Sequence, residues 1–186
     1  MDATLRKIID EIGRKPVRSS IITATALIDE VLKSLLTKFF VKGKNIKELF
    51  APQGALGTFS AKINIAYSLG LISKNLFNDL QLFRKIRNDC AHNLVLDEKF
   101  FQSTKARTKS FELLNSIIQY PENEDLLVYT SLEFMFIFAC LLKRINNIER
   151  IKEYEYEVHD DYLAFSHKDY EFIQNISKYL NENDKS

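Results

Sequence analysis

The stretch "PVRSSIITATALIDEVLKSLLTKFF", residues 16–40, decides the fold. Its apolar side chains recur every three or four residues, which is the spacing of one face of an α-helix. Pro16 suits a helix start, because proline has no backbone N–H and the N–H groups of the first turn are unpaired in any helix. The helix is expected to end at 42–44, "KGK". The apolar face consists of Val17, Ile21, Ala24, Ile28, Val31, Leu32, Leu35 and Phe39. The sequence therefore predicts a long helix that buries one side against other helices.

The remaining chain repeats this helical spacing between short turn-forming stretches. Thr58 or Ser60, and later Ser73, are candidate N-caps, because a hydroxyl can accept hydrogen bonds from the first-turn N–H groups. Tyr67 is expected on the inner side of its helix. Further helices are predicted over about 2–13, 58–70, 73–92, 97–119, 122–148 and from residue 166 onward, with a helical turn at 45–50 and a short extended segment near 153–158. The predicted fold class is all-α, a helical bundle of about six to seven helices.

Length and composition support one domain over residues 1–186. The chain is long enough to bury a core, and its 46% of apolar residues excludes a disordered protein. Five glycines and three prolines are few for a β-sandwich or barrel. Cys90 and Cys140 lie in apolar helical contexts and are expected to be reduced thiols. The first 15 residues contain acidic side chains and no continuous apolar run, unlike a signal peptide, so a cytoplasmic location is expected.

The most apolar stretch is "LLVYTSLEFMFIFACLL", residues 126–142. It is shorter than the about 20 residues that a membrane span needs, and it contains Thr130, Ser131 and Glu133. We therefore expect a buried central helix, with "FMFIF" in the core.

The charge is unevenly distributed along the chain. Residues 1–120 carry 19 Lys/Arg against 11 Asp/Glu, a net +8, whereas residues 121–186 carry 7 against 14, a net −7. Such asymmetry suggests a charged partner or one half that neutralises the other, and two solvated faces are an equal alternative. The densest acidic patch is a candidate partner-binding segment, in which tyrosines would anchor a partner and carboxylates would steer it. Its residues are Glu153, Tyr154, Glu155, Tyr156, Glu157, Asp160, Asp161 and Tyr162.

Three sequence pieces in the middle of the chain carry a family resemblance. They are Leu-Gly-x-Phe-Ser-Ala-Lys-Ile at 56–63, Ala-Tyr-x-Leu-Gly-Leu-Ile at 66–72 and Arg-Lys-Ile-Arg-Asn-x-x-Ala-His at 84–92. In this register they resemble the mannitol operon repressor family of bacterial proteins over roughly residues 17–118, although Ala55 stands where a proline is expected. The resemblance implies an all-α regulatory domain. It does not cover the acidic region 121–186, which we expect to be an extension packed on that domain.

The six residues "RNDCAH", 87–92, also match the motif of HEPN ribonucleases. In that reading His92 would transfer protons, Arg87 would stabilise phosphate charge, and Asn88 would orient them. On an ideal helix Arg87 and His92 lie about 140° apart, so catalysis would require a dimer that pairs two motifs. In the structural reading, Arg87 and Asn88 bond helix ends or loop carbonyls, and His92 bonds a carbonyl of the 50–57 loop. The structural reading is favoured, because a short Arg/His motif often occurs by chance.

Three functional hypotheses remain. The first is a non-enzymatic regulator that binds another protein. The second is an immunity or antitoxin-like protein that neutralises a basic nuclease toxin through the acidic segment, and the third is a metal-independent ribonuclease. The sequence contains no helix-turn-helix with a basic recognition helix, so specific DNA binding is not expected. No metal site and no cofactor motif is recognised, since adjacent residues such as His159, Asp160 and Asp161 cannot all face one ion. A homodimer is compatible with each hypothesis.

Overall fold

The fold is known from a computed structural model, which describes residues 16–93, 96–117, 126–153 and 171. These residues contain seven helices and no strand, which confirms the all-α prediction. The expected helix at 2–13, the helix after residue 166 apart from Glu171, and the extended segment near 153–158 apart from Glu153 lie outside the described residues. The seven helices belong to the compact unit that ends at Ile151.

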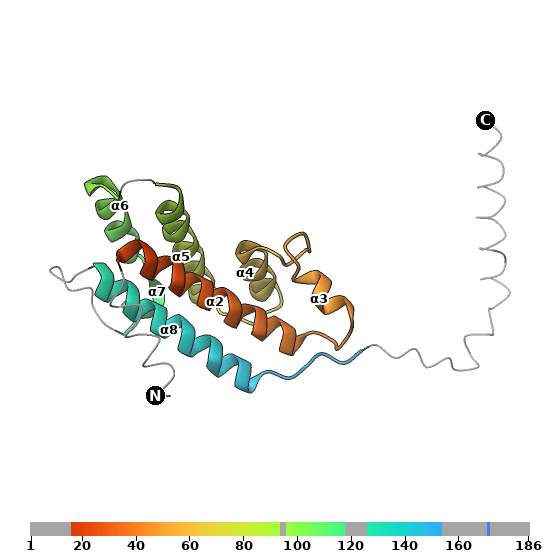
Figure 1. Cartoon of the computed structure of the whole chain (residues 1–186). Helices are drawn as coiled ribbons and strands as arrows, with labels where there is room; N and C mark the ends of the chain where they lie inside the picture. The colour runs from red at the N-terminus through yellow and green to blue at the C-terminus, as the bar shows by residue number, and fades with distance from the viewer. Residues whose placement is uncertain (1–15, 94–95, 118–125, 154–170, 172–186) are drawn as a thin grey trace. The chain divides into compact units, whose positions relative to one another are not determined.

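The central element is α2 (Val17–Phe39), which packs against α5 (Lys74–His92) and α8 (Leu126–Asn147) (Figure 1). α2 and α8 run in the same direction, because the N–H of Ile151 beyond α8 donates to the carbonyl of Phe39 at 2.9 Å. α5 runs the opposite way, since Arg18 near the start of α2 donates to the carbonyl of Cys90 near the end of α5. The predicted long helix therefore forms the centre of the bundle.

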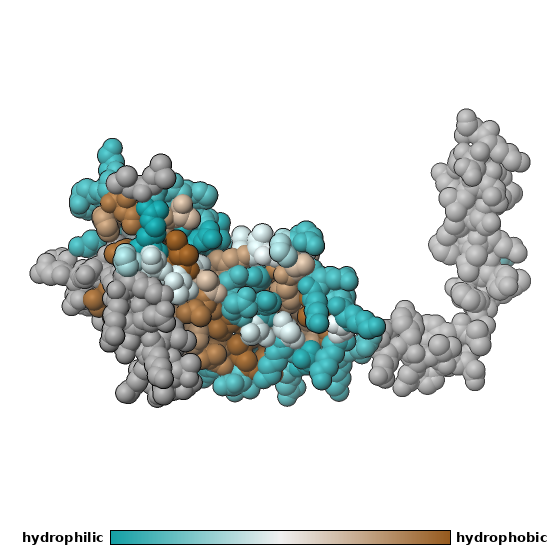
Figure 2. Space-filling model, in the orientation of Figure 1, coloured by the Kyte–Doolittle hydropathy of each residue, from teal (hydrophilic) through white to brown (hydrophobic). Residues whose placement is uncertain are grey.

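The core consists of the faces that these three helices turn toward one another. The apolar face predicted for α2 is confirmed, with Ile28, Leu32 and Leu35 fully buried. Figure 2 shows apolar side chains gathered over the middle of the helices and hydrophilic ones toward the edges. Further fully buried members include Leu80, Phe83 and Ile86 of α5 and Ile137 and Leu141 of α8. Burial of one such side chain stabilises the fold by about 1.5–3 kcal/mol.

The short helices surround this centre. α3 (Asn45–Leu49) and α4 (Phe59–Ser68) follow α2, and α6 (Glu98–Thr108) and α7 (Glu112–Asn115) lie between α5 and α8 in sequence. Thr58 and Ser73 cap α4 and α5 as expected, accepting the N–H of Ala61 at 3.1 Å and of Leu76 at 3.2 Å. α4 ends at Ser68, where the turn places Gly70 at a φ of +66°.

Two details of the sequence prediction are wrong. The single helix predicted over 97–119 is interrupted between α6 and α7, because Phe111 turns into the core and stacks on Phe83 with ring centroids 5.4 Å apart. Tyr67 does not face the core but is 38% exposed and lies against Phe77 at 4.6 Å between ring centroids. Within the described part of the chain, no helix is long and apolar enough to cross a membrane.

Candidate functional site

A groove of about 400 Å³ opens between α2, the start of α4 and α5. α2 contributes Ile22, Thr25, Ala26 and Asp29, and α5 contributes Arg84, Arg87 and Asn88. Both sets follow helical spacing of three and four residues, so each set lies along one side of its helix. The groove is completed by Thr58, Phe59 and Ser60 at the start of α4.

A tight loop fixes the start of α4 at the groove. A Cβ atom at Gly54 or Gly57 would clash with backbone carbonyls of residues 48–49 or 51–52, so the loop can close this tightly only with glycine at both positions. The N–H of Leu56 donates to the carbonyl of Leu49 at 2.8 Å, and the Leu56 side chain is buried. The Leu-Gly pair at 56–57 therefore has a structural reason, which is to deliver the cap residue Thr58 to the groove.

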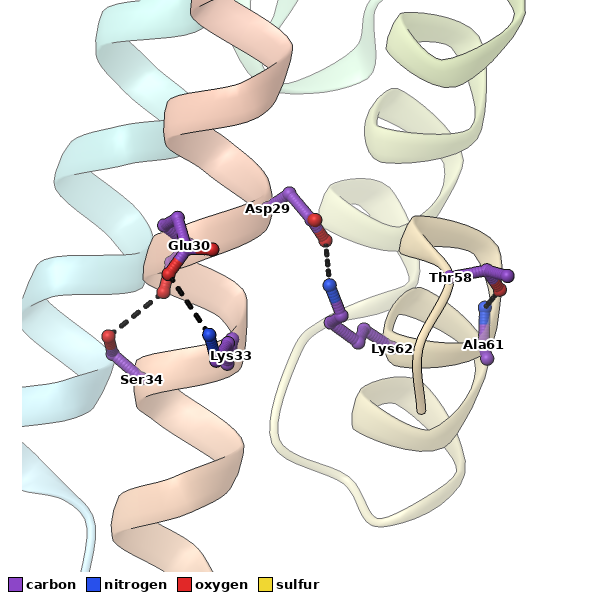
Figure 3. A network of polar contacts seen from close by, with 7 residues as sticks. All are labelled: Asp29, Glu30, Lys33, Ser34, Thr58, Ala61 and Lys62. Carbon is purple, nitrogen blue, oxygen red and sulfur yellow. Dashed lines mark hydrogen bonds and ion pairs between the residues drawn. The ribbon is translucent and has the colours of Figure 1, made fainter. Parts of the chain in front are cut away.

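An ion pair joins α4 to α2 beside the groove. Lys62 of α4 donates from Nζ to Oδ1 of Asp29 at 2.6 Å, and the two side chains point toward each other across the space between the helices (Figure 3). The Lys62 side chain is only 5% exposed, whereas that of Asp29 is 28% exposed. Asp29 thus neutralises a buried ammonium group and still reaches the groove.

The residues predicted as catalytic are only partly brought together. Arg87 donates from Nη1 to Oδ1 of Asn88 at 3.2 Å, and both line the groove. His92 is exposed at the end of α5, is not part of the groove lining, and its side chain has no hydrogen-bond partner among the described residues, the 50–57 loop included. Arg87 and Asn88 therefore belong to the groove, while a catalytic role for the three residues stays a prediction.

Cys90 lies in the same motif and packs in the hydrophobic core. Its side chain is fully buried, and burial raises the pKa of the thiol to about 11. Cys90 and Cys140 are both free thiols, as expected from the sequence. Asp89 forms an ion pair with Arg107 of α6, so the motif also ties α5 to its neighbour. No group of three metal-ligating side chains occurs among the described residues.

A second polar cluster, which the sequence reasoning did not predict, lies where α5, α7 and α8 meet. Asp79 and Glu133 are both fully buried. Asp79 accepts the N–H groups of Glu112 at 2.7 Å and Leu113 at 2.9 Å, and so caps α7 from a distant part of the chain. Burial raises the pKa of Glu133 to about 9, and the charge of the nearby Asp79 adds to this shift. Glu133 is therefore protonated at neutral pH. The one sequence signal for this cluster was Glu133, a carboxylate within the most apolar stretch of the chain.

The candidate partner-binding segment is described only at its first residue. Glu153 is exposed. Tyr154, Glu155, Tyr156, Glu157, Asp160, Asp161 and Tyr162 lie outside the described residues, so the segment stays a prediction.

Comparison with known proteins identifies the family of the chain. Residues 7–156 match the family model described as mannitol repressor, MtlR, a longer match than the roughly 17–118 that the sequence suggested. The mannitol operon repressors of Escherichia coli strain K12 and of E. coli O6:H1 are each 30% identical over 84 residues, which span 42% of this chain and 43% of theirs. The X-ray structure of the MtlR–HPr complex from E. coli shares the fold, with a TM-score of 0.60 and 18% identity over 75% of this chain and 99% of that chain. Because the family model matches most of its length, the chain belongs to the mannitol repressor family.

Proposed function

We propose that this protein is a non-enzymatic regulator of transcription that acts by binding another protein, and that its partner is related to HPr. The observation that carries the proposal is the shared fold. The chain reproduces 99% of the length of a mannitol repressor that was crystallised together with HPr. Membership of the same family makes a similar way of acting the simplest expectation for this chain.

The proposed contact surface is the acidic segment from Glu153 to Tyr162. Its five carboxylates would attract a positively charged surface, and its three tyrosines would supply rigid contact area. Glu153, the described residue of the segment, is exposed and so is available to a partner.

The test is a calorimetric titration of HPr from the same organism into the full chain. We expect saturable binding that is lost when Glu153, Glu155, Glu157, Asp160 and Asp161 are all changed to Ser. The matched control removes five exposed carboxylates elsewhere, at Glu30, Glu48, Glu98, Glu149 and Glu171. It should bind as the wild type does at physiological salt, because these carboxylates lie outside the proposed contact segment and salt screens exposed charges. Equal weakening by both variants would contradict the assignment of the segment, and no binding of HPr by the wild type would contradict the proposed partner.

The two alternatives make different predictions in the same assays. An antitoxin-like protein would bind a basic nuclease, rather than HPr, through the same segment. A ribonuclease would cleave RNA, and His92→Ala would abolish cleavage without a loss of stability, since His92 is exposed. Neither alternative has the support that the family and the fold give to the regulator.

A further inference from the structure

Among the described residues, the two arginines of the groove, Arg84 and Arg87, have no negatively charged partner. Arg84 donates from Nε to Oε1 of Gln81 at 2.9 Å, and Arg87 donates to Asn88, so both known partners are neutral amides. Neither guanidinium forms an ion pair with a carboxylate of the described residues. Each guanidinium has five N–H donors, and one of the five is paired within the part of the chain that the structure describes.

The position of these two arginines suggests that an anion from outside the chain pairs with them. Both are half-buried and line the same groove, one helical turn apart on α5. Arg107, also half-buried and on α6, is instead paired with Asp89. Two guanidinium groups that are partly removed from water and share one concave space form a site for an anion, and the planar fork of arginine matches phosphate geometry in particular.

The start of α4 adds polar groups to the groove lining. Ser60, which carries a hydroxyl, lines the groove in the first turn of α4, the turn whose backbone N–H groups have no partner within the helix. Thr58 and Ser60 both line the groove, with Thr58 capping the helix through its hydroxyl. These groups favour negative charge on a ligand that already contacts the arginines.

The rest of the lining suits a neutral, hydroxyl-bearing part of the same ligand. Asp29 is held in place by Lys62 and has carboxylate lone pairs left to accept hydroxyl groups. Asn88 keeps its amide N–H donors, and Phe59 offers an apolar face. At about 400 Å³ the groove falls within the range of small-molecule sites, about 300–1,000 Å³.

We propose that this groove binds a small phosphate monoester of a polyol or sugar, with the phosphate on Arg84 and Arg87 and the hydroxyl groups toward Asp29. The groove lining shares no residue with the acidic segment proposed to bind HPr, and the inference does not depend on that proposal. It also assigns no role to His92, which lies outside the groove lining.

The test is calorimetric titration of the full chain with sorbitol 6-phosphate, sorbitol and inorganic phosphate at low salt. We expect saturable binding of sorbitol 6-phosphate, weaker binding of inorganic phosphate, and none of sorbitol. Arg84→Gln and Arg87→Gln should each weaken binding about tenfold, the effect of losing one charged contact. Arg87→Lys should restore part of the affinity, because it keeps the charge and loses the fork.

The matched control is Lys85→Gln, which removes a positive charge from an exposed position of the same helix outside the groove lining. It should bind sorbitol 6-phosphate as the wild type does, and thermal unfolding should show that all variants are folded. Failure of the wild type to bind the phosphate ester, or equal weakening by Lys85→Gln, would overturn the site. Inorganic phosphate binding as tightly as the ester would overturn the assignment to a polyol or sugar.

Discussion

Two polar clusters of the described residues hold charged groups away from water, and the fold compensates for them in opposite ways. Beside the groove, Asp29 meets the ammonium group of Lys62 at 2.6 Å and keeps part of its side chain in water. Between α5, α7 and α8, Asp79 and Glu133 are fully buried together, and neither pairs with a cation among the described residues. Opposite charges make the first site an ion pair. The second is tolerated because Glu133 keeps its proton and Asp79 accepts two N–H groups of α7.

This difference shows that a buried carboxylate need not be a reactive one. Raised pKa values often mark catalytic sites, but they also occur in structural networks. Asp79 holds the interrupted helix in place, and the protonated Glu133 carries no charge that would repel it. The groove, by contrast, is open to solvent and contains two arginines that form no ion pair with another described residue, which is why the binding proposal concerns the groove and not the buried cluster.

The largest effect is expected for Asp79→Ala. The change leaves the N–H groups of Glu112 and Leu113 without their acceptor, at about 1–3 kcal/mol for each buried group, so a loss of about 4 kcal/mol is expected. Urea denaturation at pH 7 measures it. The control is Asp97→Ala, which removes an exposed cap of α6 and should cost about 1 kcal/mol. Equal losses in the two variants would contradict the role of Asp79 as a buried cap.

The second effect is a pH dependence that Glu133→Gln should reduce. The pKa of Glu133 is raised in the folded protein from 4.5 to about 9. Between these values the folded state keeps a proton that the unfolded chain has released, so the stability that the proton supports is lost as the pH rises. The slope is at most about 1.4 kcal/mol per pH unit. The amide of glutamine is neutral at every pH, as the protonated carboxyl is, and it has nearly the same size.

Urea denaturation of both proteins at pH 6 and pH 8 tests this expectation. The wild type should lose stability toward pH 8, and Glu133→Gln should lose less. Burial raises the pKa of Asp79 as well, so a smaller slope of the same sign should remain in the variant. Parallel pH profiles would show that Glu133 is not the group that titrates.

The third effect concerns the ion pair beside the groove. Asp29→Ala leaves the nearly buried ammonium of Lys62 without its partner, and we expect a loss of about 3 kcal/mol. Lys62→Met keeps the apolar stem and leaves Asp29, which reaches water, so about 1 kcal/mol is expected. Denaturation of both single variants and of the double variant measures the coupling between them. Equal losses in the single variants would contradict the expectation that the unpaired Lys62 costs more than the unpaired Asp29.

The sequence predicted the parts of the fold that follow from local periodicity. The stripe on α2 and the hydroxyl caps Thr58 and Ser73 depend on residues within a few positions of one another, so their spacing was sufficient. The break between α6 and α7 was missed, because it depends on Phe83 and Asp79 about 30 positions away.

The candidate site was predictable in the same limited sense. Arg87 and Asn88 were selected by their motif, but the groove also needs Asp29 and Ser60 from other helices, and only the fold brings these residues together. His92 was selected by the same motif and is exposed at the end of its helix. Its distance from Arg87 around the helix was already visible in the spacing.

The smallest effect is expected for Thr58→Ala, the local counterpart of the distant cap that Asp79 provides. The change removes the acceptor of the Ala61 N–H, which is close to water, so a loss of about 1 kcal/mol is expected. Ser73→Ala removes the equivalent cap of α5 and should cost about the same. The two variants should differ in sorbitol 6-phosphate binding, since Thr58 lines the groove and Ser73 does not. Calorimetry on both variants would separate the two roles of Thr58. Equal losses of stability, with weaker binding only in Thr58→Ala, would require a contact between Thr58 and the ligand in addition to the cap.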